Sequence, residues 1–393
     1  MAVNTMLSST IFSDLQSLET PFYLYDLALL RKSAEAAKAA ADKRGYLIHY
    51  ALKANPDSRL LEVIAAAGLG ADCVSGGEVR RAVECGFAPE KIVFEGVAKR
   101  DSDILFAIEK GIYAINCESL EEVVVINSLA ASVGKVAEIG LRLNPNIDSH
   151  TNEHLTTGRA DCKFGISRRE LKALLKLLPE LKNVHVRGVH FHIGSQILDM
   201  TVFEAQCHKA QEIVDDLRND KGVELEFVNM GGGLGIDYHN PEQNPIPDYE
   251  GYFATFEREF CLPEGMVMRF ELGRSVVAQC GELVTRVMFT KTNESGRRFL
   301  IVDSGMSQLI RPALYGAHHE VRRLGEGVGR EVYAVVGDVC ESSDTFAYQT
   351  ELPVTGRGDM LALLSAGAYG ASMASCYNLH SLPAAHYWDG ELE

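Results

Sequence analysis

The chain has 393 residues, of which 46% are hydrophobic and 23% charged, and its formal net charge is −16. This composition is ordinary for a globular protein, and the length is sufficient for two domains. The acidic balance disfavours nucleic acid and anionic membrane surfaces as partners.

The nine cysteines are scattered, and no C-x-x-C spacing occurs among them. This pattern argues against a disulfide framework and against a cysteine zinc site, and it favours a reducing compartment. The amino terminus has neither the basic region nor the apolar core of a signal peptide, and no apolar run approaches the ~18 residues of a membrane span. We therefore expect a soluble cytoplasmic protein.

A short β-prone piece at 21–25 and a helical stretch at 27–44 precede a regular alternation of strands and helices. Eight apolar runs lie at 48–52, 71–74, 92–94, 113–116, 139–143, 186–192, 225–229 and 267–271. Helix-like segments separate them at 59–67, 78–85, 103–109, 120–131, 168–178, 202–218 and 252–260. Eight such units over roughly 225 residues predict a (β/α)8 TIM-like barrel, whose typical size is ~250 residues. A doubly wound open sheet is the alternative that periodicity alone does not separate.

After Gly273 the helical periodicity fades, and short β-branched runs lie at 283–290, 299–302, 330–336 and 360–364. Turn signals such as Asn293-Glu294-Ser295-Gly296 separate these runs. We therefore predict a barrel domain over 26–265. Residues 1–25 and 266–393 are expected to form a β-rich domain, either a Greek-key barrel or a sandwich.

The first barrel run ends at Lys53, two residues before Asn55-Pro56. An unbroken apolar run suits a strand buried on both faces, and parallel α/β folds carry their chemistry at the carboxyl ends of such strands. A lysine placed there can form a Schiff base with a carbonyl cofactor. The alternative is a solvated lysine that marks the end of the strand.

Polar and glycine residues collect at the ends of other runs. Asp72 lies within the second run, His190 and His192 end the sixth, and a glycine run at 231–235 follows the seventh. The glycine run suits phosphate binding or a plain tight turn, and it matches neither a P-loop nor a Rossmann fingerprint. The two histidines face the same side of their strand. We expect no metal there, because carboxylate partners at metal spacing are missing, and favour an imidazole lying over a flat cofactor.

Eight motifs occur in the order found in diaminopimelate decarboxylases. They are YALKAN at 50–55, VSGGE at 74–78, HIGSQ at 192–196, GGGLG at 231–235, ELGR at 271–274, RPALYG at 311–316, CES at 340–342 and GAYG at 367–370. From about Pro21 to Tyr377 the chain resembles this family, which belongs to the alanine-racemase-like fold group of pyridoxal-phosphate decarboxylases. The family usually has proline where Leu272 stands.

The resemblance implies pyridoxal 5'-phosphate as cofactor. Lys53 would hold it as a Schiff base, His192 would stack on its ring, and Glu271 would keep the pyridine nitrogen protonated. The cofactor-binding positions implied are Lys53, His192, Ser195, Gly232, Gly233, Gly235, Glu271, Leu272, Gly273, Arg274 and Tyr369.

The resemblance also implies the substrate site. Its residues would be Arg274, Arg311, Tyr315, Glu341 and Tyr369. Cys340 would supply the proton that replaces the lost carboxylate, and Glu341 would bind the distal amino group. In the family this Cys-Glu pair comes from the other subunit, so we expect a homodimer with shared active sites.

The function implied is decarboxylation of meso-diaminopimelate to L-lysine, the last step of lysine biosynthesis. An arginine such as Arg311 suits a substrate with a carboxylate at each end, because a buried arginine without its anion is costly. The alternative within the fold group is a decarboxylase of ornithine, arginine or carboxynorspermidine. A cofactor-binding regulator without catalysis is a third possibility, but such a protein would be expected to lose Lys53 or Cys340, and both are present.

Overall fold

The computed structural model describes residues 9–145, 147 and 163–393, and the expectations for residues 1–8 and for Cys162 lie outside these ranges. The chain divides into two compact units. The barrel unit comprises Ala34–Gly235 and Asp248–Gly273. The β-rich unit comprises the described residues up to Ser33, together with Ile236–Pro247 and Arg274–Glu393.

Eight parallel strands close into a barrel in sequence order, as the alternation predicted. They are β2 (Leu47–Ala51), β3 (Gly70–Cys73), β4 (Ile92–Phe94), β5 (Ala114–Cys117), β6 (Ala137–Arg142), β7 (Val184–His190), β8 (Phe227–Asn229) and β9 (Val267–Leu272). The last strand pairs back onto the first, with His49 opposite Glu271. This closure rules out the open doubly wound sheet.

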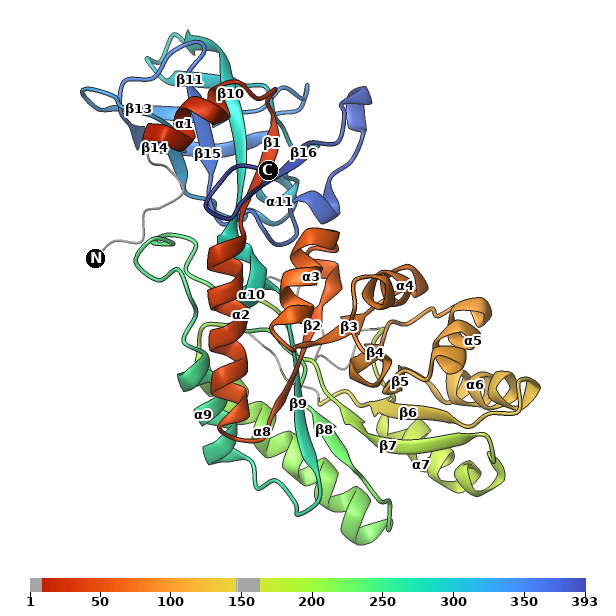
Figure 1. Ribbon diagram of the computed structural model, residues 1–393. Coiled ribbons are helices and arrows are strands. Elements are labelled where there is room, and N and C mark those ends of the chain that lie inside the picture. The colour runs from red at the N-terminus through yellow and green to blue at the C-terminus, as the bar shows by residue number, and fades with distance from the viewer. Residues whose placement is uncertain (1–8, 146, 148–162) are drawn as a thin grey trace. The chain divides into compact units, whose positions relative to one another are not determined.

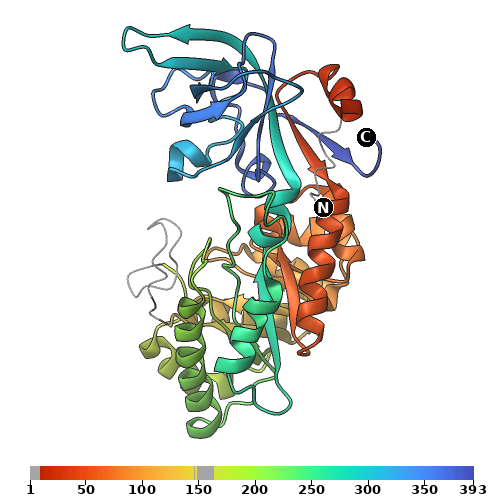
Figure 2. The same cartoon turned by 90° about the vertical axis from the view of Figure 1, so that its left-hand side faces the viewer.

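One helix precedes β2, one follows each of the seven barrel strands from β2 to β8, and together they surround the barrel (Figure 1 and Figure 2). They are α2 (Leu27–Asp42), α3 (Ser58–Ala66), α4 (Gly76–Glu84), α5 (Asp101–Lys110), α6 (Leu120–Ser132), α7 (Arg168–Leu177), α8 (Met200–Asp215) and α9 (Tyr249–Glu259). Six of them begin at a serine or aspartate whose side chain accepts a backbone N–H of the first turn, namely Asp57, Ser75, Ser119, Ser167, Asp199 and Asp248. Such caps satisfy donors that have no partner within the helix, so the local sequence fixes where these six helices begin.

Aromatic packing holds α9 against the barrel. Tyr252, Phe253 and Phe256 lie on one face of this helix, and their rings surround Phe270 of β9 at centroid distances of 4.8–5.7 Å. All four side chains are fully buried. This packing fixes β9, the strand that carries Glu271.

The β-rich unit is built on an eight-stranded sheet, in which six strands follow the order β12-β15-β10-β11-β13-β14. The other two are β1, which pairs with β10, and β16, which pairs with β1. Its strands are β1 (Phe22–Asp26), β10 (Gly281–Thr292), β11 (Arg298–Val302), β12 (Val321–Arg323), β13 (Glu331–Val336), β14 (Thr345–Leu352), β15 (Met360–Leu363) and β16 (Ala384–Trp388). Three short helices, α1 (Ser9–Gln16), α10 (Arg274–Val277) and α11 (Arg311–Tyr315), complete it.

The expected boundary between the domains at 265/266 is too early. Residues 267–272 form β9, which pairs with β2 and β8, so the barrel extends to Gly273. Residues 236–247, which we expected in the barrel domain, group with the β-rich unit instead. Among the described residues, no helix has the length and apolarity needed to cross a membrane.

Candidate active site

Lys53 lies directly after β2, in the 3₁₀ turn Leu52–Ala54. Because β2 and β3 pair with Ala51 opposite Asp72, the Nζ of Lys53 comes within 3.3 Å of Oδ2 of the fully buried Asp72. Burial raises the pKa of Asp72 to about 7, against the lowering effect of the ammonium. The Lys53 side chain is 35% exposed, so its amine is paired with an acid and still reachable by a ligand.

Two more buried carboxyl groups lie at the same end of the barrel, on Glu95 after β4 and on Glu271 of β9. The Nε2 atom of His190, at the end of β7, is 3.4 Å from Glu95 Oε1 and 3.1 Å from Glu271 Oε2. Burial raises the pKa of each carboxyl group to about 7, with a further contribution from Glu271 on Glu95 and from Asp72 on Glu271. Burial also lowers the pKa of His190 to about 4, so its ring is neutral at pH 7.

Two buried amides hold this cluster in place. Asn116 Nδ2 donates to Glu95 Oε1 at 2.6 Å, and Asn229 Nδ2 donates to Glu271 Oε1 at 2.5 Å. The expectation that the strand histidines lack carboxylate partners is wrong for His190, because Glu95 and Glu271 reach it from other strands, with ligand atoms within 4.8 Å of one another. That spacing would admit a metal ion, but the amide hydrogen bonds already account for the two carboxylates.

The glycine loop after β8 lies against His192. The N–H of Gly232 donates to His192 Nδ1 at 3.3 Å, which leaves the proton of the neutral ring on Nε2. Burial, and secondarily the Lys53 ammonium, holds the pKa of His192 well below its usual range. A Cβ on Gly232 would lie 1.8 Å from the carbonyl oxygen of Glu271, so only glycine fits there.

The loop that carries Ser195 runs beside the glycine loop. The N–H of Ile197 donates to the carbonyl of Gly233 at 2.9 Å, and the N–H of Gly235 donates to the carbonyl of Ile197 at 3.0 Å. Gly233 has φ +106°, a left-handed conformation that favours glycine. The structure thus brings together three residues expected to hold a phosphate.

Leu272 and Gly273 connect the glutamate strand to the lysine turn. Leu272 ends β9 and is buried. A Cβ on Gly273 would lie 3.0 Å from Cβ of Ala54 and 3.1 Å from Cβ of Ala51, the residues on either side of the Leu52-Lys53 pair. Glycine at 273 therefore permits the close packing that holds the Lys53 turn against β9.

In the β-rich unit, two buried arginines share one hydroxyl group. The Oη atom of Tyr238 accepts from Nη1 of Arg274 at 2.7 Å and from Nη1 of Arg311 at 2.9 Å. The same Nη1 of Arg311 lies 3.0 Å from Nε2 of His319. Sequence reasoning missed Tyr238 and His319. The available signals were a tyrosine three residues after Gly235 and a histidine pair just after the RPALYG motif.

Two other predicted tyrosines belong to the arginine group. The guanidinium carbon of Arg274 lies 4.8 Å from the ring centroid of Tyr369, whose φ is +56°. Tyr315 ends α11, the helix that Arg311 begins, so the two residues lie one helical turn apart. Tyr315 also contributes to raising the pKa of Arg274, after Tyr238 and Tyr369.

Cys340 and Glu341 lie in the turn between β13 and β14, and both are exposed. The buried Asp344 holds this turn by accepting the N–H of Val339 at 2.8 Å. The hydroxyl of Tyr377 donates to Glu341 Oε1 at 2.7 Å. The turn therefore has a defined shape, and its two candidate functional side chains face solvent in the single chain.

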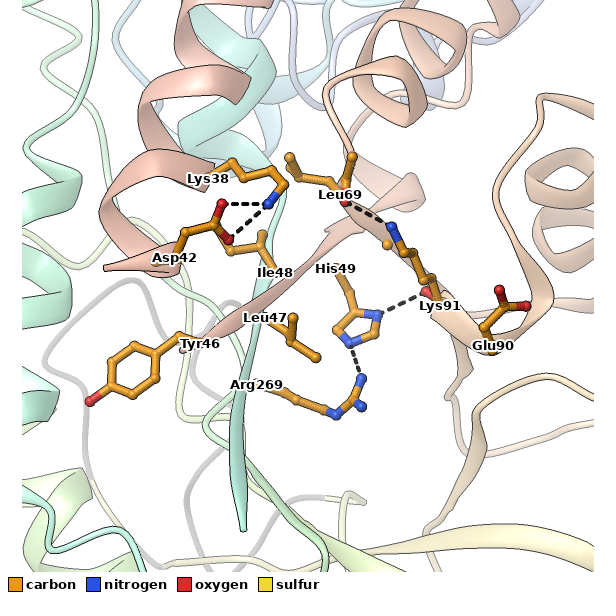
Figure 3. Close-up of a pocket in the computed structure, with 13 residues that line it drawn as sticks. Lys38, Asp42, Tyr46, Leu47, Ile48, His49, Leu69, Glu90, Lys91 and Arg269 are labelled. Atoms are coloured by element: carbon orange, nitrogen blue, oxygen red, sulfur yellow. Dashed lines mark hydrogen bonds and ion pairs between the residues drawn. The ribbon is translucent and has the colours of Figure 1, made fainter. Parts of the chain in front are cut away.

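A pocket of about 130 Å³ lies at the amino ends of β2 and β3, away from the end that carries Lys53, and Figure 3 shows its lining. There Nη1 of Arg269 donates to Nε2 of His49 at 3.0 Å, and the guanidinium carbon lies 3.4 Å from the ring centroid of Tyr113. Burial, followed by the charge of Arg269, lowers the pKa of His49 to about 3, which keeps its Nε2 an acceptor. None of the predicted site residues lines this pocket, and we interpret it as part of the packing that closes the amino end of the barrel.

Comparisons with known proteins agree with this arrangement. Residues 27–278 match the family model described as the pyridoxal binding domain of pyridoxal-dependent decarboxylases. A diaminopimelate decarboxylase of Bacteroides thetaiotaomicron is 46% identical over 375 residues, which are 95% of this chain and 97% of that protein. The chain belongs to the diaminopimelate decarboxylase family.

Solved structures of this family have the same fold. The crystal structure of diaminopimelate decarboxylase from Helicobacter pylori complexed with L-lysine has a TM-score of 0.90 at 37% identity and covers 97% of this chain and 94% of that one. The enzyme from M. jannaschii in co-complex with L-lysine has a TM-score of 0.89 at 32% identity and covers 96% and 89%. Pyridoxal phosphate is accordingly the cofactor of this chain.

The barrel residues fit this cofactor. Lys53 offers a reachable amine, and the buried carboxyl group of Glu271 is a suitable partner for a protonated ring nitrogen. The orphaned Oδ1 of Asp72 is a further buried acceptor that has no hydrogen-bond partner among the described residues. In the glycine loop, the backbone at Gly232 packs directly against β9, with no space for a side chain between them.

Proposed function

We propose that this chain decarboxylates meso-diaminopimelate to L-lysine with pyridoxal phosphate. The observation that carries the proposal is Arg311, a buried guanidinium that makes no ion pair with a described carboxylate. A buried charge without its partner costs several kcal/mol, so this arginine requires an anion from a ligand. The carboxylate that diaminopimelate retains is such an anion.

The barrel residues hold and tune the cofactor. Bound pyridoxal phosphate supplies the electron sink for the pair left behind when carbon dioxide departs. Lys53 would hold it through the amine, Glu271 would hold a proton at the ring nitrogen, and His192 would pack against the ring. The backbone N–H groups of the glycine loop, with Ser195, Arg274 and Tyr369, bind the phosphate.

The arginine group selects the substrate. Arg311 and Arg274, with Tyr315 and Tyr369, bind the retained carboxylate through the planar fork that suits carboxylate geometry. Ornithine, arginine and carboxynorspermidine each carry only the carboxylate that is lost, and would leave Arg311 buried and unpaired. For this reason we favour diaminopimelate over the other substrates of the fold group.

We also propose that two copies of the chain complete each other's active sites. Cys340 supplies the proton that replaces the lost carboxylate, and Glu341 binds the distal amino group, both acting in the partner's site. The exposure of both residues in the single chain supports this assignment. We place the reaction in the cytoplasm, because all eight described cysteines are free.

The decisive assay supplies meso-diaminopimelate and measures L-lysine and carbon dioxide. Lys53→Ala should abolish both products and the visible absorbance of the bound cofactor. Lys91→Ala is the matched control, because Lys91 lies at the amino end of the barrel and its Nζ donates to the carbonyl of Gly68. Full activity of Lys53→Ala would refute the proposal.

Two further experiments separate the remaining assignments. Arg311→Ala should abolish turnover of diaminopimelate and spare any activity on a substrate with one carboxylate; equal losses on both would favour the alternative substrates. Mixing the inactive Lys53→Ala and Cys340→Ala variants should restore part of the activity through mixed dimers. A fully active monomer would exclude the shared site.

A further inference from the structure

The two N–H groups on Nη1 of Arg311 already have acceptors within the β-rich unit. One points to Oη of Tyr238 at 2.9 Å and the other to Nε2 of His319 at 3.0 Å. No described residue accepts a hydrogen bond from Nε or Nη2 of Arg311. Nε and Nη2 form the edge with two parallel N–H bonds by which an arginine binds a carboxylate in bidentate fashion. The two acceptors therefore leave this one edge of the guanidinium for a ligand.

His319 is held in the state that accepts from Arg311. Its ring is fully buried, and its Nδ1 lies 2.8 Å from the carbonyl oxygen of Leu364, which can only accept. The ring proton is thus on Nδ1, and Nε2 carries the lone pair. Burial, followed by the charge of Arg311, lowers the pKa of His319 to about 3, so the ring stays neutral at physiological pH.

Tyr238 stabilises the close approach of the two positively charged guanidinium groups. Its oxygen accepts from Arg274 at 2.7 Å as well as from Arg311, and its ring meets that of His319 edge-on at a centroid distance of 5.3 Å. Without this oxygen, the two guanidinium groups would repel each other across a buried space. Tyr238 therefore sets the distance between the arginines, and His319 sets the rotation of Arg311.

We propose that Tyr238 and His319 are positioning residues that orient Arg311 for the retained carboxylate, and that they thereby select substrates with a second carboxylate. This inference rests on the proposed function. It adds two residues that act through Arg311 and not on the reacting atoms.

The test uses the holoenzyme and two ligands that differ only in this carboxylate, L-lysine and 1,5-diaminopentane. Tyr238→Phe and His319→Leu should each weaken inhibition by L-lysine and raise KM for meso-diaminopimelate by about tenfold or more, with a smaller effect on kcat, because each removes an acceptor of the charged Arg311. Tyr238→Phe also removes the acceptor of Arg274. Inhibition by 1,5-diaminopentane and cofactor absorbance should not change. His319→Gln, whose Oε1 can accept from Nη1, should restore most of the lysine affinity.

His318→Leu is the matched control. His318 is the preceding residue, stacks on His239 at a centroid distance of 4.2 Å and lies 3.4 Å from Glu320, so its loss should leave both ligands unaffected. Equal weakening of both ligands, or unchanged lysine inhibition in Tyr238→Phe, would overturn the inference. Tyr238→Phe keeps the packed ring, so it carries the test if His319→Leu does not fold. If the wild-type enzyme releases no L-lysine from meso-diaminopimelate, the proposed function itself is wrong.

Discussion

The buried acid cluster predicts that Glu95→Gln stabilises the protein in a pH-dependent way. Burial raises the pKa of Glu95 from 4.5 to about 7. Between these values the folded protein keeps a proton that the unfolded chain has lost, so stability falls as the pH rises through this window and stays lower above it. A pKa difference of about 2.5 at ~1.4 kcal/mol per pH unit gives a cost of about 3 kcal/mol at pH 8 and under ~1 kcal/mol at pH 5.

Glutamine at 95 removes this cost and keeps the acceptor for Asn116 and a donor toward Glu271. We expect Glu95→Gln to raise the thermal midpoint of the cofactor-free protein at pH 8, by about 2–4 °C per kcal/mol for a unit of this size, and far less at pH 5. Circular dichroism across this pH range measures the difference.

The same cluster predicts an asymmetry between its two glutamates. Glu271→Gln should weaken cofactor binding by about tenfold or more, because it removes a charged partner of the ring nitrogen. Glu95→Gln should leave cofactor affinity nearly unchanged, as followed by the visible absorbance of the bound cofactor. A stability gain that is equal at pH 5 and pH 8, or equal cofactor losses in both variants, would refute the reasoning.

Two further predictions concern other buried sites. Glu282, in β10, has its pKa raised to about 7 by burial, and its Oε2 has no hydrogen-bond partner among the described residues. Glu282→Gln should therefore increase stability in urea at pH 8 by about 3 kcal/mol and much less at pH 5; a gain without pH dependence would contradict this. Gly232→Ala should abolish cofactor binding and lower the melting temperature, because its Cβ would meet the carbonyl oxygen of Glu271 at 1.8 Å. Gly356→Ala, where a Cβ meets nothing within 4 Å, should leave both quantities unchanged, and a normal Gly232→Ala protein would show that the loop can relax.

The barrel was predictable because each of its strands and helices has a recognisable pattern of apolar and polar residues in the local sequence. All eight apolar runs became strands, with ends shifted by at most a few residues, and helices begin at serine or aspartate caps. Part of the β-rich unit was missed. Strand β14 reads Thr-Phe-Ala-Tyr-Gln-Thr-Glu-Leu, which contains no apolar run. It is the last strand of the order β12-β15-β10-β11-β13-β14, and several of its side chains are exposed. Strands of this kind give a weak signal.

The sequence by itself determined the alternation of strands and helices, the lysine at the end of β2 and, through ordered motifs, the family. These properties depend on residues close together in the chain, where hydrophobic period and turn chemistry are readable. Only the tertiary structure decided that Glu95, His190 and Glu271 meet, because Glu95 follows β4, His190 ends β7 and Glu271 lies in β9, and barrel closure brings these strand ends together. It alone placed Tyr238 between the arginines, since contacts between distant segments are set by packing and register, which no local pattern records.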